Sequence, residues 1–174
     1  LGLARRYAVV ALVATAVITS ALALLVRSSS DASIDAVMFS GQEGIAEILT
    51  LTSVSTVLLV VVAKLIAYGF ALGSGFRGGP IFPAVFLGVA TATVLTLVFP
   101  SLSLTAMVVV GIAASTAAAL KLPFTSALLA LLIVAGAGMD IAPFAIIGAV
   151  LGLIVRLALD RTGLLEVPSR EPAH

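Results

Sequence analysis

The amino-acid sequence predicts an all-α integral membrane protein with tilted and discontinuous helices. Of its 174 residues, 61% are hydrophobic and 10% are charged, whereas soluble domains average about half and a quarter. Residues 7–26 carry no charge, and at ~1.5 Å per residue such a helix crosses the ~30 Å hydrocarbon layer. Glycine, proline and charged residues divide the rest into apolar pieces, most of them shorter than a simple spanning helix.

Charge and residue usage exclude several classes of function. The net charge of +1 gives no large basic surface, so we expect no nucleic acid partner. The chain has no cysteine, and its one histidine is His174 at the C-terminus. Disulfides, thiolate metal sites and histidine-centred sites are therefore not expected. We predict no metal site, no cofactor and no enzymatic activity.

The first predicted helix covers residues 7–26. Arg5 and Arg6 precede it, so a cleavable signal peptide is an alternative interpretation. The apolar run is long for a signal core and many apolar segments follow, which favours a membrane span. A polar linker follows at residues 27–35, and Gly41-Gln42-Glu43-Gly44 extends it.

The second predicted helix covers residues 48–68 and carries Lys64 late in the run. A charge inside the membrane is costly and marks transport pathways. Lysine also extends along a helix to place its ammonium at the membrane surface. We favour this snorkelling interpretation of Lys64 over a role in the pathway.

Four further segments follow a helix-breaking stretch at residues 73–83. Helices are predicted over residues 84–99, 101–120, 124–137 and, opened by Asp140 and Pro143, up to about residue 159. The third of these six predicted helices ends at Pro100, and small residues in the fourth permit close helix contacts. We divide the chain into a transmembrane domain at 1–160 and a polar C-terminal tail at 161–174.

The stretch at residues 74–83 carries the most specific chemistry in the chain. It reads Ser74, Gly75, Phe76, Arg77, Gly78, Gly79, Pro80, Ile81, Phe82 and Pro83. Irregular backbone at membrane depth must be buried in protein or line a wet cavity. Glycines let N–H groups converge, and a helix that starts near Pro80 or Ile81 points its positive dipole end at the same place. This predicts an anion site made of backbone amides, and the alternative is a surface turn between two spans.

This stretch resembles the second filter motif of the ClC family of chloride channels and proton-coupled chloride antiporters. The family pattern is close to Ser-Gly-x-x-Gly-Gly-Ile-Phe-x-Pro. Without a gap it matches Ser74, Gly75, Gly78, Gly79 and Pro83, and Ile81-Phe82 is displaced by one position. Downstream, Gly111-Ile112-Ala113-Ala114 and Leu122-Pro123-Phe124-Thr125 resemble the Gly-x-x-Ala and Arg-x-Pro-Leu-Thr region of the family.

The resemblance implies one repeat of a ClC-type inverted-repeat fold, corresponding to the C-terminal half of a subunit. It implies chloride or a similar monovalent anion as the substrate and a multi-pass protein of the cell membrane. It further implies a homodimer, with an interface of roughly residues 125–133 and 141–154. Because the chain begins with Leu1, we expect the N-terminal half of the subunit to be missing upstream.

The same resemblance implies which residues bind chloride. In the family, amides of the Ile and Phe of this motif coordinate the ion, and the gapless register places them at Pro80 and Ile81. Proline has no N–H, so we expect Ile81, with Phe82 replacing the lost donor, beside Gly79. The filter loop would comprise Ser74, Gly75, Arg77, Gly78 and Pro83, with Arg77 either attracting anions or marking the aqueous end of a helix.

Two departures from the family leave alternatives open. A tyrosine of the last helix reaches the ion in the family, yet residues 163–168 contain none. The gating motif belongs to the first repeat, and the segment around Glu43 resembles it but precedes the wrong helix. The alternatives are a non-conducting membrane scaffold or regulatory subunit, or a transporter of another anion such as fluoride. The residues present do not separate a channel from an antiporter.

Overall fold

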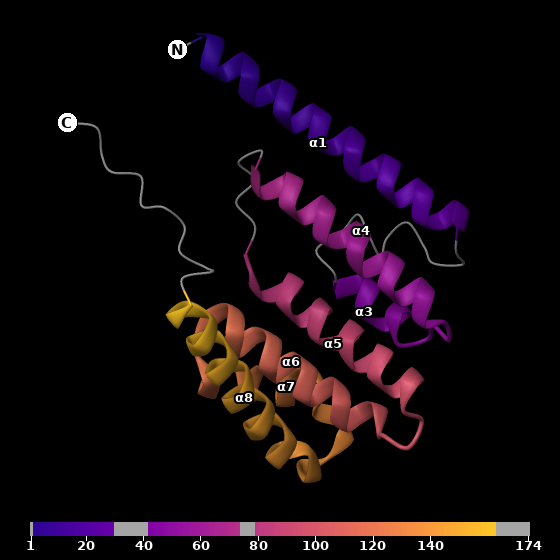
Figure 1. Cartoon of the computed structure of the whole chain (residues 1–174), viewed down its shortest axis with the longest axis vertical. Coiled ribbons are helices and arrows are strands. Elements are labelled where there is room, and N and C mark those ends of the chain that lie inside the picture. Colours follow the sequence, from indigo (N-terminus) through magenta and orange to yellow (C-terminus); the bar gives the residue numbers. More distant parts are fainter. Residues whose placement is uncertain (1, 30–41, 74–78, 163–174) are drawn as a thin grey trace, which may run out of the picture.

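A computed structural model describes residues 2–29, 42–73 and 79–162 of the chain, and the regular structure in these ranges is helical (Figure 1). The α-helices are α1 (Gly2–Ser29), α3 (Gln42–Ile48), α4 (Val54–Gly73), α5 (Ile81–Val98), α6 (Leu104–Leu120), α7 (Pro123–Ile133) and α8 (Ala142–Arg161). Two 3₁₀ turns, η1 (Ala135–Ala137) and η2 (Met139–Ile141), join α7 to α8. Within the described ranges, three helices are long and apolar enough to cross a membrane, at Val54–Ala71, Ile81–Val98 and Ala142–Arg161. The all-α integral membrane fold class is thereby confirmed.

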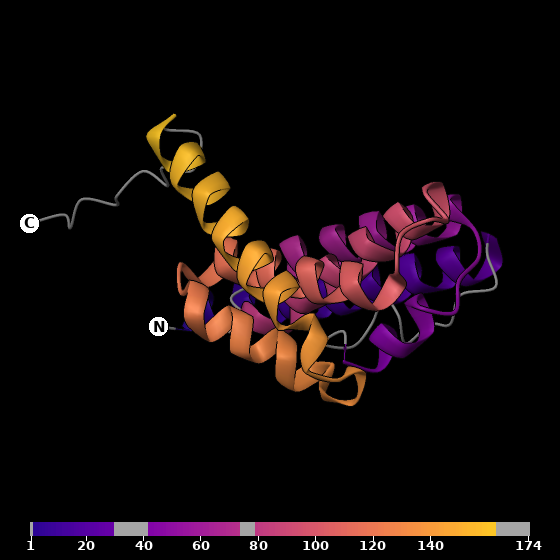
Figure 2. The same cartoon turned by 90° about the horizontal axis from the view of Figure 1, so that it is seen from below.

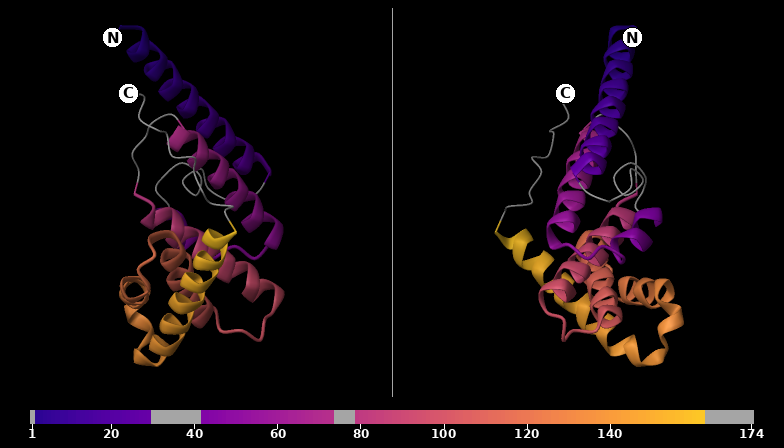
Figure 3. Two further views of the ribbon diagram at one scale, coloured as in Figure 1. Left: turned by 60° about the vertical axis from the view of Figure 1, so that its left-hand side comes forward. Right: turned by 90° about the vertical axis from the view of Figure 1, so that its right-hand side faces the viewer.

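Helices α1, α4, α5 and α6 pack one against the next, and α6 lies at the centre of the C-terminal group of helices. Helix α1 lies along α4, α4 lies along α5, and α6 contacts α5, α7 and α8 (Figure 1). Helix α8 is steeply inclined to its neighbours (Figure 2). Both views of Figure 3 place α1 at one end of the molecule and α7 with α8 at the other. Helix α5 therefore lies between α4 and α6.

Glycines allow α6 to approach its neighbours backbone to backbone. Gly88 of α5 meets Gly111 of α6, and a Cβ added at Gly88 would also lie 2.6 Å from Ser115 Oγ. On the other side of α6, a Cβ at Gly148 of α8 would lie 2.6 Å from the Val110 oxygen. Lipid tails are as apolar as the helices, so such close packing replaces the hydrophobic effect as the force that holds helices together. The predicted close contacts of the small-residue helix are confirmed.

The predicted start of the helix over residues 48–68 is wrong, although one apolar helix long enough to span covers residues 54–68. Helix α3 ends at Ile48, and α4 begins at Val54 and continues to Gly73. Between them the Thr50 amide and hydroxyl both donate to the Glu47 oxygen, at 2.9 and 2.7 Å, and the Ser53 and Ser55 hydroxyls are 2.8 Å apart. Hydroxyl side chains compete with the helix for backbone groups, and they end α3 here.

The remaining boundaries shift for local reasons. Helix α7 stops at Ile133 rather than at residue 137, because a glycine-containing segment follows and Gly138 adopts a φ of 87° that side chains disfavour. Helix α6 begins at Leu104, after a turn in which the Leu102 amide donates to the Phe99 oxygen at 3.0 Å. Helix α8 starts at Ala142 with Pro143 in its first turn, close to the predicted position.

Candidate functional site

The predicted anion ligands lie at the N-terminus of α5. The helix begins at Ile81 with Pro80 as the N-cap residue, which confirms the start predicted near Pro80 or Ile81 and extends the apolar stretch at 84–99 toward the N-terminus. The Ala84 amide donates to the Pro80 oxygen at 3.1 Å. The first N–H groups of a helix have no acceptor within it. Neither Pro80 nor Pro83 carries an N–H, so this first turn presents two such donors, the amides of Ile81 and Phe82.

The N-terminus of α5 is open on one side of the described chain. Gly79 and Pro80 are exposed, and Ile81 and Phe82 are each 39% exposed. A Cβ added at Gly79 would meet no atom within 4 Å among the described residues. Pro83, in contrast, is half-buried. A ligand or another protein segment can therefore approach the two amide donors from this side.

Several residues of the sequence-based prediction lie outside the described ranges. These are the filter-loop residues Ser74, Gly75, Arg77 and Gly78, and the segment 163–168 where the family has its tyrosine. Glu43 lies in the first turn of α3, and its side chain is not among those described. The downstream motifs are described: Gly111 to Ala114 lie in α6, and Pro123 is the first residue of α7.

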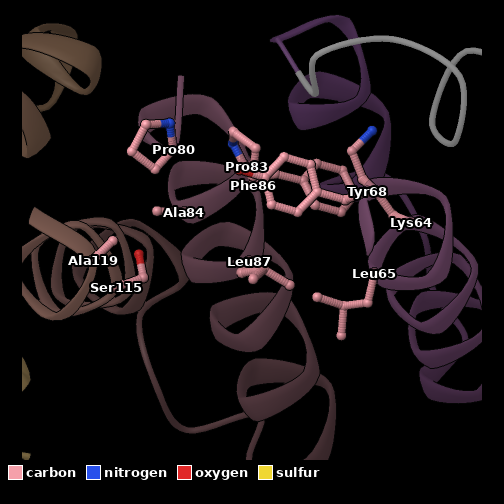
Figure 4. A pocket seen from close by; sticks show the side chains of 10 residues that line it. All are labelled: Lys64, Leu65, Tyr68, Pro80, Pro83, Ala84, Phe86, Leu87, Ser115 and Ala119. Atoms are coloured by element: carbon pink, nitrogen blue, oxygen red, sulfur yellow. The ribbon is translucent and has the colours of Figure 1, made fainter. Parts of the chain in front are cut away.

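A cavity of about 240 Å³ adjoins the N-terminus of α5 (Figure 4). Side chains from α4 lie on one side, side chains from α6 on the other, and α5 lies between them. Its lining residues are Lys64, Leu65, Tyr68, Pro80, Pro83, Ala84, Phe86, Leu87, Ser115 and Ala119. The cavity is thus mostly apolar and contains three polar side chains, those of Lys64, Tyr68 and Ser115.

Lys64 is buried in this cavity and does not extend from a helix end. It lies near the middle of α4, is 7% exposed, and its Nζ is 4.5 Å from the centroid of the Phe86 ring. Phe86 is itself fully buried. An ammonium over an aromatic face is attracted by the ring quadrupole. The snorkelling interpretation is therefore wrong, because Lys64 faces protein instead.

The sequence-based reasoning missed two polar groups of the cavity, Tyr68 and Ser115. The Ser115 hydroxyl donates to the Gly111 oxygen at 2.8 Å, which satisfies its hydrogen within α6. Tyr68 follows Lys64 by four residues, so the two share one face of α4. That spacing was the one signal in the sequence that could have linked Tyr68 to the buried charge. Ser115 comes from another helix and gave no such signal.

A second group of charges joins the C-terminal ends of α6 and α8. The Lys121 Nζ is 2.6 Å from Asp160 Oδ2, and Arg156 Nε donates to Asp160 Oδ1 at 3.0 Å. Arg156 also donates to the Ala118 oxygen at 3.4 Å. These groups join α8 to α6, and none of the three side chains lines the cavity. Among the described side chains, no three His, Cys, Asp or Glu residues gather as metal ligands would.

The comparisons with known proteins assign the chain to a family. A family model described as "Voltage gated chloride channel" matches residues 2–156. No curated protein and no solved structure gives a significant match. The matched region contains every described helix except residues 157–161 of α8, and it includes the stretch that resembles the chloride filter. This protein therefore belongs to the voltage-gated chloride channel family.

Proposed function

We propose that the protein carries chloride, or a similar monovalent anion, across a membrane and binds it with the backbone amides of Ile81 and Phe82. Membership of the family makes an anion the class of substrate and makes the protein an integral membrane protein. The observation that carries the proposal is the first turn of α5, where two N–H groups lack acceptors within the helix beside a cavity. The cell membrane as the location rests on family resemblance alone.

The mechanism is replacement of the hydration shell of the anion. Backbone N–H groups and the positive end of the α5 dipole would offer the anion fixed partial charges in place of water. Such dipoles act strongly in a region of low dielectric constant, and they need no reorganisation as the ion arrives. No covalent bond changes, so the expected role is transport rather than catalysis.

The prolines limit the number of donors. With N–H groups at positions 80 and 83 absent, two amides cannot complete the coordination of an anion. We propose that other segments supply the remaining ligands: Gly79 and the filter-loop residues Ser74, Gly75, Arg77 and Gly78, and the N-terminal half of a two-repeat subunit. The exposure of Gly79, Pro80, Ile81 and Phe82 on one side of the described chain supports this arrangement.

A non-conducting scaffold or regulatory subunit is the second candidate, and Pro80 is the observation that favours it. A liposome assay separates the two functions. Protein expressed from the complete reading frame is reconstituted, and release of chloride, bromide, nitrate and fluoride is recorded with ion-selective electrodes. Chloride release supports the proposal. Release of no anion supports the scaffold, and release of fluoride alone identifies a fluoride transporter. Proton uptake coupled to chloride release distinguishes an antiporter from a channel.

A gain-of-function variant tests the site itself. Pro80→Ala restores one N–H at the N-cap, and a net hydrogen bond of about 1 kcal/mol predicts a roughly fivefold lower half-saturating chloride concentration. Pro143→Ala is the matched control, because Pro143 is exposed in the first turn of α8. Equal half-saturation in both variants and wild type would place the anion elsewhere.

We also propose that the protein is a homodimer through α7 and α8. Apolar side chains exposed on these helices support it, among them Leu128, Leu132, Ile146, Val150 and Ile154. The chain has no cysteine, so single-cysteine variants report proximity without background. Leu132→Cys, in α7, should form a disulfide-linked dimer in membranes, whereas Val17→Cys, at the opposite end in α1, should not. Crosslinking of neither variant, or of both equally, argues against this interface.

A further inference from the structure

Lys64 places a positive charge inside the fold beside the N-terminus of α5, and the proposed coordination by amides makes no use of it. The side chain is 7% exposed and its Nζ lies 4.5 Å from the Phe86 ring centroid. Phe86 belongs to α5 and lies five residues after Ile81, in the second turn of the helix. The ammonium is therefore held against the helix whose first turn carries the donor amides.

The cavity connects this charge to the proposed anion site. Lys64 lines it together with Pro80 and Pro83, which flank Ile81 and Phe82 in the sequence. Figure 4 shows Lys64 and Tyr68 on the α4 side of the cavity, beside Phe86 and Pro83 of α5, with Pro80 farther across. Among the described residues that line this cavity, Lys64 has the one charged side chain. An anion at the first turn of α5 would thus lie beside the cavity that holds this cation.

We propose that Lys64 strengthens binding of the transported anion, because its ammonium raises the electrostatic potential at the first turn of α5. This inference rests on the proposed function. Charged side chains inside membrane proteins face cavities and mark ion pathways, and Lys64 lines the same cavity as the N-cap residue of α5. A further hydrogen bond to Lys64 would hold the ammonium in place without removing its charge.

The competing explanation is structural. The ammonium over Phe86 joins α4 to α5, and such a contact stabilises a fold without any effect on an ion. The two explanations differ in what they require of residue 64. Electrostatic attraction of the anion requires a positive charge at residue 64, whatever the shape of the side chain. Stabilisation of the α4–α5 packing requires a side chain of lysine's size against the Phe86 ring.

The test measures chloride dependence in liposomes for wild type, Lys64→Met and Lys64→Arg. Methionine keeps the approximate length and removes the charge, and arginine keeps the charge. At an effective dielectric constant of about 20, loss of a unit charge ~10 Å from an anion lowers its affinity roughly tenfold. We expect a roughly tenfold higher half-saturating chloride concentration in Lys64→Met and a value near wild type in Lys64→Arg. Lys121→Met, which changes a lysine outside the cavity, should leave chloride dependence unchanged.

Thermal stability and equilibrium binding make each outcome decisive. Chloride binding to each variant in detergent is measured by calorimetry, alongside its Tm. Unchanged chloride dependence in Lys64→Met overturns the role of Lys64 and leaves the proposed function intact. Equal losses in Lys64→Met and Lys64→Arg, tracking a lower Tm, identify a structural brace and also overturn it. Wild type that neither transports nor binds chloride refutes the proposed function, and this inference with it.

Discussion

The contact between Gly88 of α5 and Gly111 of α6 gives a sharp prediction for Gly88→Ala. The added Cβ would lie 2.6 Å from Ser115 Oγ and would also collide with the backbone of Gly111. Real Cβ atoms do not approach other heavy atoms this closely, and backbone cannot rotate away as a side chain can. The two helices must therefore move apart. Overpacking of this kind costs ~1–3 kcal/mol, from which the helix propensity of alanine over glycine recovers up to ~1 kcal/mol.

Gly69→Ala is the matched control for this prediction. Gly69 lies in α4, and a Cβ at this position would meet no described atom within 4 Å. It therefore gains the propensity of alanine without the collision. We expect the Tm in detergent, followed by fluorescence-detected size exclusion after heating, to fall in Gly88→Ala and to stay level or rise in Gly69→Ala. If the two variants have the same Tm, the helices do not approach as closely as described.

Two further perturbations test local features. Gly138→Ala should lower the Tm, because a φ of 87° with a ψ of 177° costs a residue with a side chain ~1–3 kcal/mol. Gly136→Ala should not lower it, because a Cβ there meets no described atom within 4 Å. Equal Tm values for the two variants would refute the backbone strain at Gly138. Asp160→Asn removes the negative charge shared by Lys121 and Arg156. It should lower the Tm modestly, and less so at 1 M salt than at low salt, because partly exposed ion pairs are screened. A loss that is independent of salt would show that packing of Asp160, rather than its charge, is responsible.

The fold class could be predicted because the membrane imposes strong rules on composition. Long uncharged segments and helix breakers are local properties of the sequence, and they indicated all the later helices to within a few residues. The error at Thr50 to Ser53 arose because hydropathy treats threonine as compatible with a span. The structure ends α3 there through hydroxyl hydrogen bonds, and these depend on the conformation of the turn rather than on the average polarity of the segment.

The site could be predicted in part. The start of α5 and its donor amides followed from the proline and glycine positions, which constrain the backbone wherever they occur. The surroundings of Lys64 could not be predicted, since burial depends on which helix lies opposite. Hydropathy located the charge in a span. A lysine that extends to the membrane surface and a lysine that is buried against protein have the same sequence pattern there. Phe86 and Ser115, from two other helices, distinguish the two only once the helices are packed.

Packing and anion affinity are coupled through α5. Gly88 lies seven residues after Ile81, which is about two helical turns, or roughly 10 Å along the axis. Phe86, against which Lys64 packs, lies between them. A shift of α5 away from α6 therefore moves the donor amides, and it moves Phe86 relative to the ammonium. If chloride is bound at this first turn, Gly88→Ala should weaken its binding as well as the fold, and Gly69→Ala should not. A lower Tm with unchanged chloride affinity would mean that the anion is held by groups that do not move with α5.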